Sequence, residues 1–568
     1  MTALFIATVL LPAVLGVSLL VTQAPAVERA VVPVAAVALL PGLFAAGHQV
    51  DLPWLLLGVR LAVDAVSAPL LLLAGLLWGA AAWYARGAMA DDPRRRTFFA
   101  FFAVTLAGNT GVLLAGDLAG FYLAYAVMTF AAYPLVVHDR TAEAYRAGRV
   151  YLTMAVAAEA ALLIAVLWIA APFGNLPLSA VPAAVAAHPQ GGWIAGLAVA
   201  AFAVKMGVAP LHVWLPLAHP AAPVAASAVL SGVLVKAGLV GWLRFLPLGE
   251  AAWAGLGTVC LVLGLTTAFY GVAVGVVQSR IKTVLAYSTI SQMGLLTAGV
   301  GIALAAAPAA WPLLMPALLL FALHHGLAKG ALFLAAGLHG RLRLGLLALP
   351  ALSLTGLPPL AGFVAKSGLK EAGYWAPDGW VAALPWLLAL SSVATMWLMA
   401  RLLWLAGGNQ GSAAEHTVRG EGGRIGAAGF LVAAALIVPW AWADLHGVLW
   451  FDVALTPSAW WMAVWPVAVG AGAAYVVARF GRGVMGRRCP AIPEGDLLEP
   501  VVALGRGVAA VARRWWARRP VVPEYSPQEW FWRLLAVAED KLSATAVVGT
   551  MFILLVLGIS LLGLFAGR

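Results

Sequence analysis

The chain is short of cysteine and of charged residues. Of its 568 residues only two are cysteine, Cys260 and Cys489, and 10% are Asp, Glu, Lys or Arg. One cysteine in an apolar run and one in a polar stretch provide neither a disulfide framework nor a cysteine-based metal or iron–sulfur site. The sequence also has no clear haem-attachment motif and no glycine-rich nucleotide loop. We therefore expect this chain to bind no cofactor and no metal.

The low charge also excludes several classes of protein. A soluble domain is about 45–50% apolar and about 25% charged, whereas this chain is 63% hydrophobic. That composition excludes a soluble enzyme and a disordered chain. The net charge of +11 does not indicate nucleic acid, because the arginine runs lie between apolar segments, where they report orientation and lipid headgroups. We predict an all-α polytopic membrane protein in contact with lipid, without nucleic acid.

Apolar runs of the length that a bilayer helix needs, about 20 residues, recur along the whole chain. The first run has neither a basic leader nor a convincing cleavage site, so we predict a retained helix and not a signal peptide. About sixteen spans are predicted, at residues 2–22, 29–48, 66–86, 97–116, 118–137, 151–172, 191–213, 223–248, 250–278, 283–306, 311–338, 344–366, 379–406, 426–444, 460–480 and 543–566.

The basic residues predict the orientation of these spans. Odd-numbered connections carry most of the arginines, and even-numbered ones carry few, chiefly Arg60, Arg244, Lys366 and Lys370. The positive-inside rule then places the odd connections in the cytoplasm and both termini outside a bacterial-type inner membrane. The basic residues of the odd connections are Arg29, Arg86, Arg94, Arg95, Arg96, Arg140, Arg146, Arg149, Arg280, Lys282, Arg341, Arg343, Arg419 and Arg424.

The predicted organisation has five parts. They are N-terminal helices (1–94), a core (95–406), additional helices (407–480), a linker on the cytoplasmic face (481–542) and a C-terminal transmembrane anchor (543–568). Within the linker, apolar residues between 501 and 515 recur at helical spacing with arginines between them, which predicts a basic amphipathic helix. A linker that lies on lipid and a strut that grips a neighbouring subunit are equally favoured.

Several ionisable residues fall inside the apolar spans, where they are costly and commonly mark an ion path. Any one of them can be a structural ion pair, but buried charges on five separate helices are harder to explain by structure alone. Lysine, histidine and glutamate can exchange protons near neutral pH in a buried setting, whereas arginine stays charged. The residues are Glu159, Lys205, Lys236, His324, His325, Lys329 and Arg401, with Asp117 and Lys366 nearer to span ends.

Proline and glycine accompany two of these charges. Lys205 is followed by Pro210, and the stretch 356–366 contains two consecutive prolines before Lys366. Such residues interrupt a helix and free carbonyls that are tolerated at membrane depth inside the protein. We predict that the seventh and twelfth helices are broken, as in transporters built from inverted repeats. The alternative is that proline and glycine are simply frequent in membrane helices.

Five motifs resemble one family of membrane proteins. They occupy residues 210–223, 231–238, 282–294, 325–334 and 357–366, and the similarity extends over about residues 95–405. The chain is similar to the antiporter-like subunits of respiratory complex I, of group 4 membrane hydrogenases and of multisubunit cation/proton antiporters. The stretch His219-Pro-Ala-Ala-Pro223 is nearest to the hydrogenase and antiporter branch.

The resemblance implies a role for individual residues. Lys205 would be the central lysine of the seventh helix and Lys236 the connecting lysine of the eighth. His325 and Lys329, which their i, i+4 spacing puts on one helix face, match the histidine and lysine of the eleventh helix, and Glu159 matches an acidic position on the sixth. Secondary candidates are Asp117, His212, His219, His324 and Lys366.

Two positions depart from the family pattern. Where the fifth helix carries Trp-Glu, this chain has Tyr125-Ala126, and the outward exit group corresponds to Arg401. The missing carboxylate is the one that pairs with the seventh-helix lysine. Either Glu159 replaces it as the partner of Lys205, or this chain does not pump as its relatives do.

The leading functional prediction is a non-redox subunit that moves protons, or Na⁺, inside a larger complex with other membrane subunits and a peripheral cytoplasmic subunit. The predicted relay runs Glu159–Lys205–Lys236–His325/Lys329–Arg401. One alternative is a non-pumping subunit that anchors its partners. Another is the membrane subunit of an energy-coupled inorganic carbon uptake system.

Overall fold

The computed structural model describes residues 1–568 except residues 24, 54–57, 409–419, 481–491 and 499–568. The chain forms two units, a larger one of Met1–Val50 and Arg60–Glu494 and a smaller one of Asp51–Val59 and Gly495–Arg568. All helices that the structure describes belong to the larger unit. The predicted anchor, 543–568, and most of the predicted linker, 481–542, lie outside the described residues.

The described residues are almost entirely helical. Two short strands, β1 (Gln49–Leu52) and β2 (Val59–Ala62), form a two-stranded sheet. A π-helical turn, Leu230–Leu234, separates two of the helices. The α-helices are α1 (Thr2–Val21), α2 (Pro25–Arg29), α3 (Val31–Ala36), α4 (Leu39–Phe44), α5 (Ser67–Ala88), α6 (Arg95–Leu114), α7 (Leu118–Val136), α8 (Ala142–Phe173), α9 (Val181–Ala187), α10 (Gly191–Met206), α11 (Trp214–Ala221), α12 (Val224–Val229), α13 (Lys236–Phe245), α14 (Ala254–Gly275), α15 (Ile281–Ala305), α16 (Trp311–Ala336), α17 (Gly340–Thr355), α18 (Ala361–Ala372), α19 (Leu384–Gly408), α20 (Glu421–Leu445), α21 (Phe451–Ala454) and α22 (Pro457–Phe480).

The fold class is confirmed, because the described residues contain thirteen helices that are long and apolar enough to cross a membrane. These helices coincide with thirteen of the predicted spans. Two more predicted spans, 191–213 and 344–366, fall on the shorter helices α10 and α17, each of which is followed by a stretch that is not α-helical. The span predicted at 543–566 lies outside the described residues.

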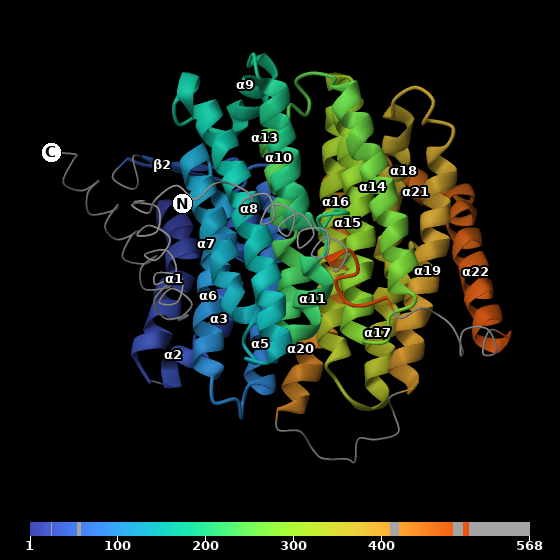
Figure 1. Ribbon diagram of the computed structural model, residues 1–568, viewed down its shortest axis with the longest axis horizontal. Helices are drawn as coiled ribbons and strands as arrows, with labels where there is room; N and C mark the ends of the chain where they lie inside the picture. The colour runs from blue at the N-terminus through green and yellow to red at the C-terminus, as the bar shows by residue number, and fades with distance from the viewer. Residues whose placement is uncertain (24, 54–57, 409–419, 481–491, 499–568) are drawn as a thin grey trace, which may run out of the picture. The chain divides into compact units, whose positions relative to one another are not determined.

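The long helices lie side by side in the larger unit (Figure 1). Helix α16 is buried over its most apolar stretch, and α15 and the run Val224–Phe245 are nearly so. A helix that is apolar all round belongs in such an interior. By contrast α1, α8 and α22 leave large apolar side chains exposed, as expected of helices that face lipid. Helix α20 (orange in Figure 1) returns to pack against α5 and α16.

Glycine allows α14 and α15 to approach closely. A Cβ atom built on Gly264 would lie 2.3 Å from the backbone nitrogen of Ala298, and one on Gly301 would lie 2.4 Å from the backbone nitrogen of Leu261. Small residues at such crossings are typical of helix pairs in membranes, where close van der Waals packing drives association. The α14–α15 contact therefore depends on the absence of a side chain at these positions.

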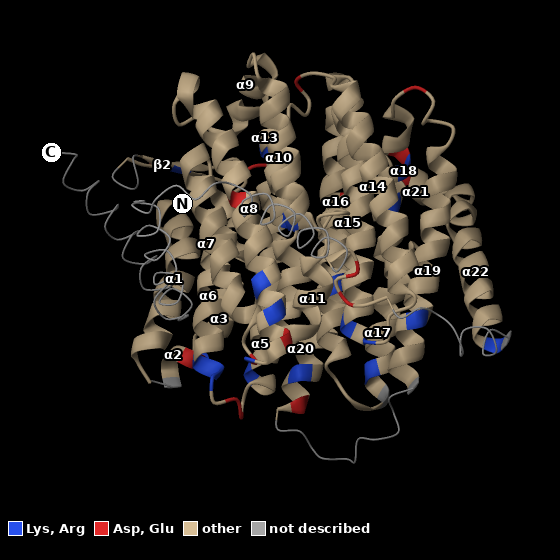
Figure 2. Ribbon diagram, viewed as in Figure 1, with Lys and Arg blue, Asp and Glu red and all other residues tan. Residues whose placement is uncertain are grey.

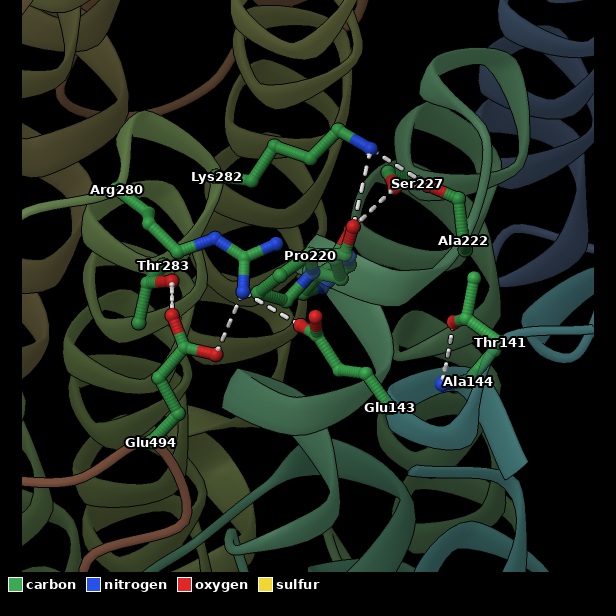
Figure 3. Close-up of polar contacts among 11 residues, drawn as sticks. Thr141, Glu143, Ala144, Pro220, Ala222, Ser227, Arg280, Lys282, Thr283 and Glu494 are labelled. Atoms are coloured by element: carbon green, nitrogen blue, oxygen red, sulfur yellow. Dashed lines mark hydrogen bonds and ion pairs between the residues drawn. The ribbon is translucent and has the colours of Figure 1, made fainter. Parts of the chain in front are cut away.

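Lysine and arginine gather at one end of the helices of the larger unit, low in the view of Figure 2. This end, termed the basic end below, includes the turn between α14 and α15. There Arg280 Nη1 lies 2.5 Å from Glu143 Oε1 in the first turn of α8 and 3.1 Å from Glu494 Oε2, while Thr283 Oγ1 donates to Glu494 Oε1 at 2.6 Å (Figure 3). Burial would lower the pKa of Arg280, but the two carboxylates outweigh it and raise the pKa. Glu143, Arg280 and Glu494 are called the Arg280 cluster below.

At the opposite end of the helices Asp64 joins two elements. Its carboxylate accepts hydrogen bonds from Nη1 and Nη2 of Arg244 at the end of α13, the one from Nη2 at 2.8 Å. It also accepts hydrogen bonds from the backbone N–H groups of Val66 and Ser67 at the start of α5. Burial would raise the pKa of Asp64, but the hydrogen bonds and the charge of Arg244 outweigh it and lower the pKa to about 2.

The Asp64–Arg244 pair predicts a dependence of stability on pH. Because the pKa is depressed in the folded state, the ionised carboxylate stabilises the fold above the ordinary pKa of 3.8, and this stabilisation is lost as the pH falls through 2. The Asp64 side chain is 43% exposed, and water screens the pair, so we expect Asp64→Asn to cost about 1 kcal/mol at neutral pH and less near pH 2. Thermal unfolding of the detergent-solubilised protein against pH measures this, with Asp378→Asn, an exposed residue outside the network, as control. An equal loss at both pH values would contradict it.

Candidate functional site

Lys205 lies where α10 ends inside the protein. It occupies the last turn of this helix, which is capped by Gly207 in the left-handed conformation (φ +71°). A glycine at this position commonly ends a helix, and the following proline cannot donate a backbone hydrogen bond. The Val204 carbonyl in the last turn of α10 accepts a hydrogen bond from Trp214 Nε1 at 2.7 Å, at the start of α11. The break thus places a lysine beside unwound backbone.

A small cavity surrounds the Lys205 side chain. Its volume is about 10 Å³, about the space that one water needs. Lys205 Nζ donates to Thr129 Oγ1 at 2.8 Å and lies 5.2 Å from the ring centre of Tyr125 and 5.9 Å from that of Tyr151. Aromatic faces attract a cation at such distances. The lining residues are Tyr125, Thr129, Tyr151, Ala155, Ala158, Glu159, Val204, Lys205 and Trp214.

Glu159 brings a carboxylate to this cavity from α8. Its side chain is buried, and Thr129, which accepts a hydrogen bond from Lys205 Nζ, also interacts with its carboxylate. The charges of Glu159 and Lys205 act on each other, although the ammonium nitrogen donates to Thr129. Ala126, where the family pattern predicts the carboxylate, lies one helical turn before Thr129 on α7. The carboxylate of the cavity therefore comes from α8 and not from α7.

Lys236 is the first residue of α13, and only Val235 separates it from the π-helical turn. Its Nζ donates to the backbone oxygen of Ser231 at 2.7 Å, and Ser231 Oγ is hydrogen-bonded to Thr289 Oγ1 at 2.7 Å. π-Turns free backbone groups and are frequent at functional sites. Gly238, two residues further, is so close to α10 that a Cβ atom there would lie 3.3 Å from Lys205 Cβ. The backbone that carries Lys236 therefore touches Lys205.

Helix α16 carries the next three groups. Lys329 Nζ donates to the Leu285 backbone oxygen at 2.9 Å, and His324 Nε2 is hydrogen-bonded to Ser353 Oγ at 2.8 Å. Neither ring nitrogen of His325 has a partner among the described residues. The charge of Lys236 acts on both histidines, and the charges of Lys236 and Lys329 act on each other. The eighth and eleventh predicted spans thus bring their charged groups together.

Lys366 lies beside the second break, between α17 and α18. Helix α17 is capped by Gly356 in the left-handed conformation (φ +86°), and α18 begins at Ala361. Lys366 Nζ donates to the Thr355 backbone oxygen and to Ser392 Oγ, both at 3.1 Å. The lysine thus binds a carbonyl in the last turn of α17, and its charge acts on His324.

Arg401 lies apart from this line of groups. Its Nε and Nη2 donate to the Gln278 backbone oxygen at 3.1 and 2.9 Å, and its guanidinium stacks on Trp404 at 4.6 Å. The side chain is partly exposed. These contacts fasten α19 to the turn between α14 and α15 at the basic end.

The remaining secondary candidates have different surroundings. Asp117 is the N-cap of α7, and its carboxylate accepts a hydrogen bond from the backbone N–H of Gly120 at 2.8 Å, as N-cap side chains commonly do. It also accepts hydrogen bonds from the backbone N–H of Arg60 at 2.6 Å and from Asn175 Nδ2 at 3.2 Å. His212 is buried, with its ring 5.2 Å from that of Tyr270. His219 is buried in α11 and stacks on Phe333.

Three polar residues of α7 and α8 that line the Lys205 cavity, Tyr125, Thr129 and Tyr151, are absent from the sequence-based candidates. Tyr125 and Thr129 are spaced i, i+4 on α7, and Tyr151 and Glu159 are two such steps apart on α8, so each pair shares a helix face. Tyr151 Oη donates to the Thr129 backbone oxygen at 2.7 Å. A polar stripe along each helix is the signal that could have identified them.

This arrangement of long apolar helices, two interrupted helices and a line of buried cations defines a polytopic membrane protein with an antiporter-like core. Residues 115–390 match the family described as NADH:quinone oxidoreductase/Mrp antiporter, transmembrane. The match covers 276 of the 568 residues, and the predicted resemblance to this family is confirmed.

The relatives include subunits of several machines. An Na(+)/H(+) antiporter subunit of Alkalihalophilus pseudofirmus is 29% identical over 363 residues, which are 60% of this chain and 72% of the relative. Hydrogenase-4 component B of Escherichia coli is 30% identical over 336 residues, 54% of this chain and 50% of the relative, so the match spans only half of that protein. The solved Mrp complex of a Dietzia species contains a chain with a TM-score of 0.63 and 24% identity, covering 83% of this chain and all of that one. At this identity the likeness shows the fold alone.

Proposed function

We propose that the chain is the ion-translocating subunit of a multisubunit membrane complex and that it moves protons through its buried charges. The observation that carries this proposal is the Lys205 cavity, which is lined by both Glu159 and Lys205 and has space for about one water. Na⁺ is the alternative cargo, because the relative from Alkalihalophilus is named as a Na⁺/H⁺ antiporter subunit.

Glu159 and Lys205 form the switch of the proposed mechanism. In a medium of low dielectric constant the attraction between two charges depends strongly on their separation. In the structure Lys205 Nζ donates a hydrogen bond to Thr129 Oγ1. A small movement of the flexible lysine side chain toward Glu159 strengthens the attraction between the ammonium and the carboxylate. A movement away favours release of a proton. Tyr125 and Tyr151 stabilise the ammonium in the position seen here.

The proposed path continues along the other lysines and histidines. Lys236 passes the proton to His325 and Lys329, with which it interacts electrostatically. We assign the far end of the path to Lys366, because it is buried beside a helix break and interacts with His324. Arg401, the end of the relay expected from the sequence, has a positioning role in this proposal, since a guanidinium does not release its proton.

We also infer partners and orientation. Subunits of this kind lie beside other membrane subunits, and the matched structures come from multisubunit complexes. A peripheral cytoplasmic subunit and both termini on the outer side follow from the resemblance and from the basic end. The predicted linker and anchor would contact a neighbouring membrane subunit.

Replacing Lys236 tests this function. We expect Lys236→Ala to lower proton movement by about tenfold or more in the native complex reconstituted into liposomes, because the relay loses its connecting base. Lys236→Arg keeps a charge but cannot release a proton, and should also fail while the complex assembles normally. Normal transport in both variants would overturn the proposal.

The second candidate function, a subunit that only anchors its partners, is favoured by the alanine at position 126. Under that function Lys236→Ala and Glu159→Gln would leave transport by the complex unchanged. Removal of residues 481–568 would instead dissociate the complex. The buried carboxylate of Glu159, in the same cavity as Lys205, argues against this function, because burying a charged pair costs stability unless the pair has a use.

A further inference from the structure

Arg424 is a buried arginine without an acidic partner. It lies at the start of α20 and is 8% exposed, whereas an arginine that only reaches for the headgroups keeps its charged end in water. Its Nη2 donates to the Tyr84 hydroxyl at 3.1 Å and to the backbone oxygen of Gly337. Its Nε has no acceptor, and no carboxylate forms an ion pair with it, among the residues that the structure describes. Burying such a cation costs stability unless an anion compensates it.

Arg343 brings a second guanidinium to the same tyrosine. Its charge and that of Arg424 both act on Tyr84, and the guanidinium of Arg424 lies 5.2 Å from the centre of the tyrosine ring. The Nε of Arg343 is buried without a hydrogen-bond partner in the described part of the chain, where this residue has no ion pair either. The first turn of α17, which begins at Gly340, has neither an acidic residue nor a side-chain cap, so its backbone N–H groups also favour an anion. Tyr84, Arg343 and Arg424 are called the Tyr84 cluster below.

The Tyr84 cluster lies at the basic end of the helices, beside side chains that suit a membrane interface. Helices α5 and α16 end there, and α17 and α20 begin there (Figure 2). Trp83 of α5 is exposed and contacts α20. Leu342 and Leu344, on either side of Arg343 in the sequence, are exposed as well. Tryptophan is typical of the headgroup level of a bilayer, and leucine is suited to the acyl chains.

We propose that the Tyr84 cluster binds the headgroup phosphate of an anionic phospholipid at the basic end. A planar guanidinium presents parallel N–H donors that match phosphate oxygens in pairs, and the Nε groups of both arginines have no other acceptor among the described residues. The exposed Trp83, Leu342 and Leu344 would lie against the acyl chains, which a soluble phosphate does not have. Because Arg424 also binds α5 and the end of α16, the lipid would join these helices to α17 and α20. The proposed relay includes none of these residues, so the two proposals are independent.

Thermal unfolding tests the nature of the ligand. The full chain is purified in detergent, stripped of lipid and titrated with phosphatidylglycerol, with phosphatidylcholine of the same acyl chains, or with sodium phosphate. Because a ligand that binds only the folded state stabilises it by mass action, we expect phosphatidylglycerol to raise the midpoint of unfolding by about 2 °C or more and the other two to raise it much less. An equal shift with sodium phosphate would overturn the assignment to lipid. An equal shift with phosphatidylcholine would overturn the preference for an anionic headgroup.

Arg343→Gln tests the site, because the Arg343 side chain donates no hydrogen bond in the described residues whose loss would disturb the fold. We expect this variant to need about tenfold more phosphatidylglycerol for half of the stabilising effect, since hydrogen bonds between charged groups are among the strongest. Arg149→Gln, which removes an exposed arginine of α8, is the matched control and should respond as the unchanged protein does. Equal responses of Arg343→Gln and Arg149→Gln would show that only the overall charge attracts the lipid, and would overturn the site.

Native mass spectrometry tests whether the site is occupied in the membrane. The complex purified from membranes in mild detergent should retain one anionic phospholipid more per copy of this chain than a complex that carries Arg343→Gln. Arg424→Lys, which keeps the charge but loses the planar fork, should also retain less of this lipid. Equal retention in the unchanged complex and in both variants would overturn the proposal and favour a carboxylate of a neighbouring subunit as the partner of these arginines.

Discussion

Replacing Glu159 by glutamine is expected to lower proton movement by the reconstituted complex by about tenfold or more. Glutamine has nearly the same shape, but it carries no charge and cannot accept a proton. Lys205 would then have no anionic partner at the cavity, whose other polar groups are hydroxyls and an indole. Proton uptake into liposomes, followed with a pH-sensitive dye, measures the loss.

The same position allows a rescue experiment. Adding Ala126→Glu to Glu159→Gln returns a carboxylate to α7, one turn from Thr129, and should restore a measurable part of the rate. Glu421→Gln, at the start of α20, changes a carboxylate outside the cavity and serves as the matched control. Full activity of Glu159→Gln would show that the carboxylate has no part in transport.

The second large effect concerns the fold. Gly264→Ala is expected to cost about 3 kcal/mol or more of stability, at the upper end of overpacking costs, or to prevent accumulation of the protein. The new Cβ atom would meet backbone atoms of Ala298 and Gly294 at 2.3 and 2.6 Å. Backbone cannot rotate away as a side chain can, so α14 and α15 must separate. Membrane yield and thermal unfolding in detergent measure the effect.

Gly255→Ala is a matched control in the same helix. A Cβ atom there has nothing within 4 Å, and alanine favours helix over glycine by about 1 kcal/mol. This variant should be neutral or slightly more stable. Equal stability of the Gly264→Ala and Gly255→Ala proteins would show that the α14–α15 contact can widen freely.

The spans could be predicted from sequence because a bilayer imposes a length and a composition on each helix. The break in the twelfth span was also predictable, from Gly356 and the two prolines that follow it. The exact ends of α17 and α18, at Thr355 and Ala372, were not, because the apolar run continues across the break. Local hydrogen bonding by Ser353 and Lys366 favours this break.

The candidate site was predictable in its residue types but not in its pairings. Burial of Lys205 and Lys236 follows from their place in apolar runs. That α8 turns Glu159 toward the same cavity as Lys205, 46 residues further along the chain, depends on the rotation of two helices, which no local pattern encodes. Arg401 and Lys366 show the same limit, because both are cations in apolar surroundings, yet one holds a surface turn and the other lines a break.

The contacts of Glu494 have a consequence for the order in which the protein is made. Arg280 and Glu143 are synthesised long before Glu494, which follows Thr283 by 211 residues. At roughly 5–20 residues per second, this delay is about 10–40 s. During that time Glu143 is the one carboxylate of the Arg280 cluster that has been synthesised. Glu494 then completes the cluster. The Arg280–Glu494 contact can therefore form only after α22 has been synthesised and the segment that follows it has returned to the basic end.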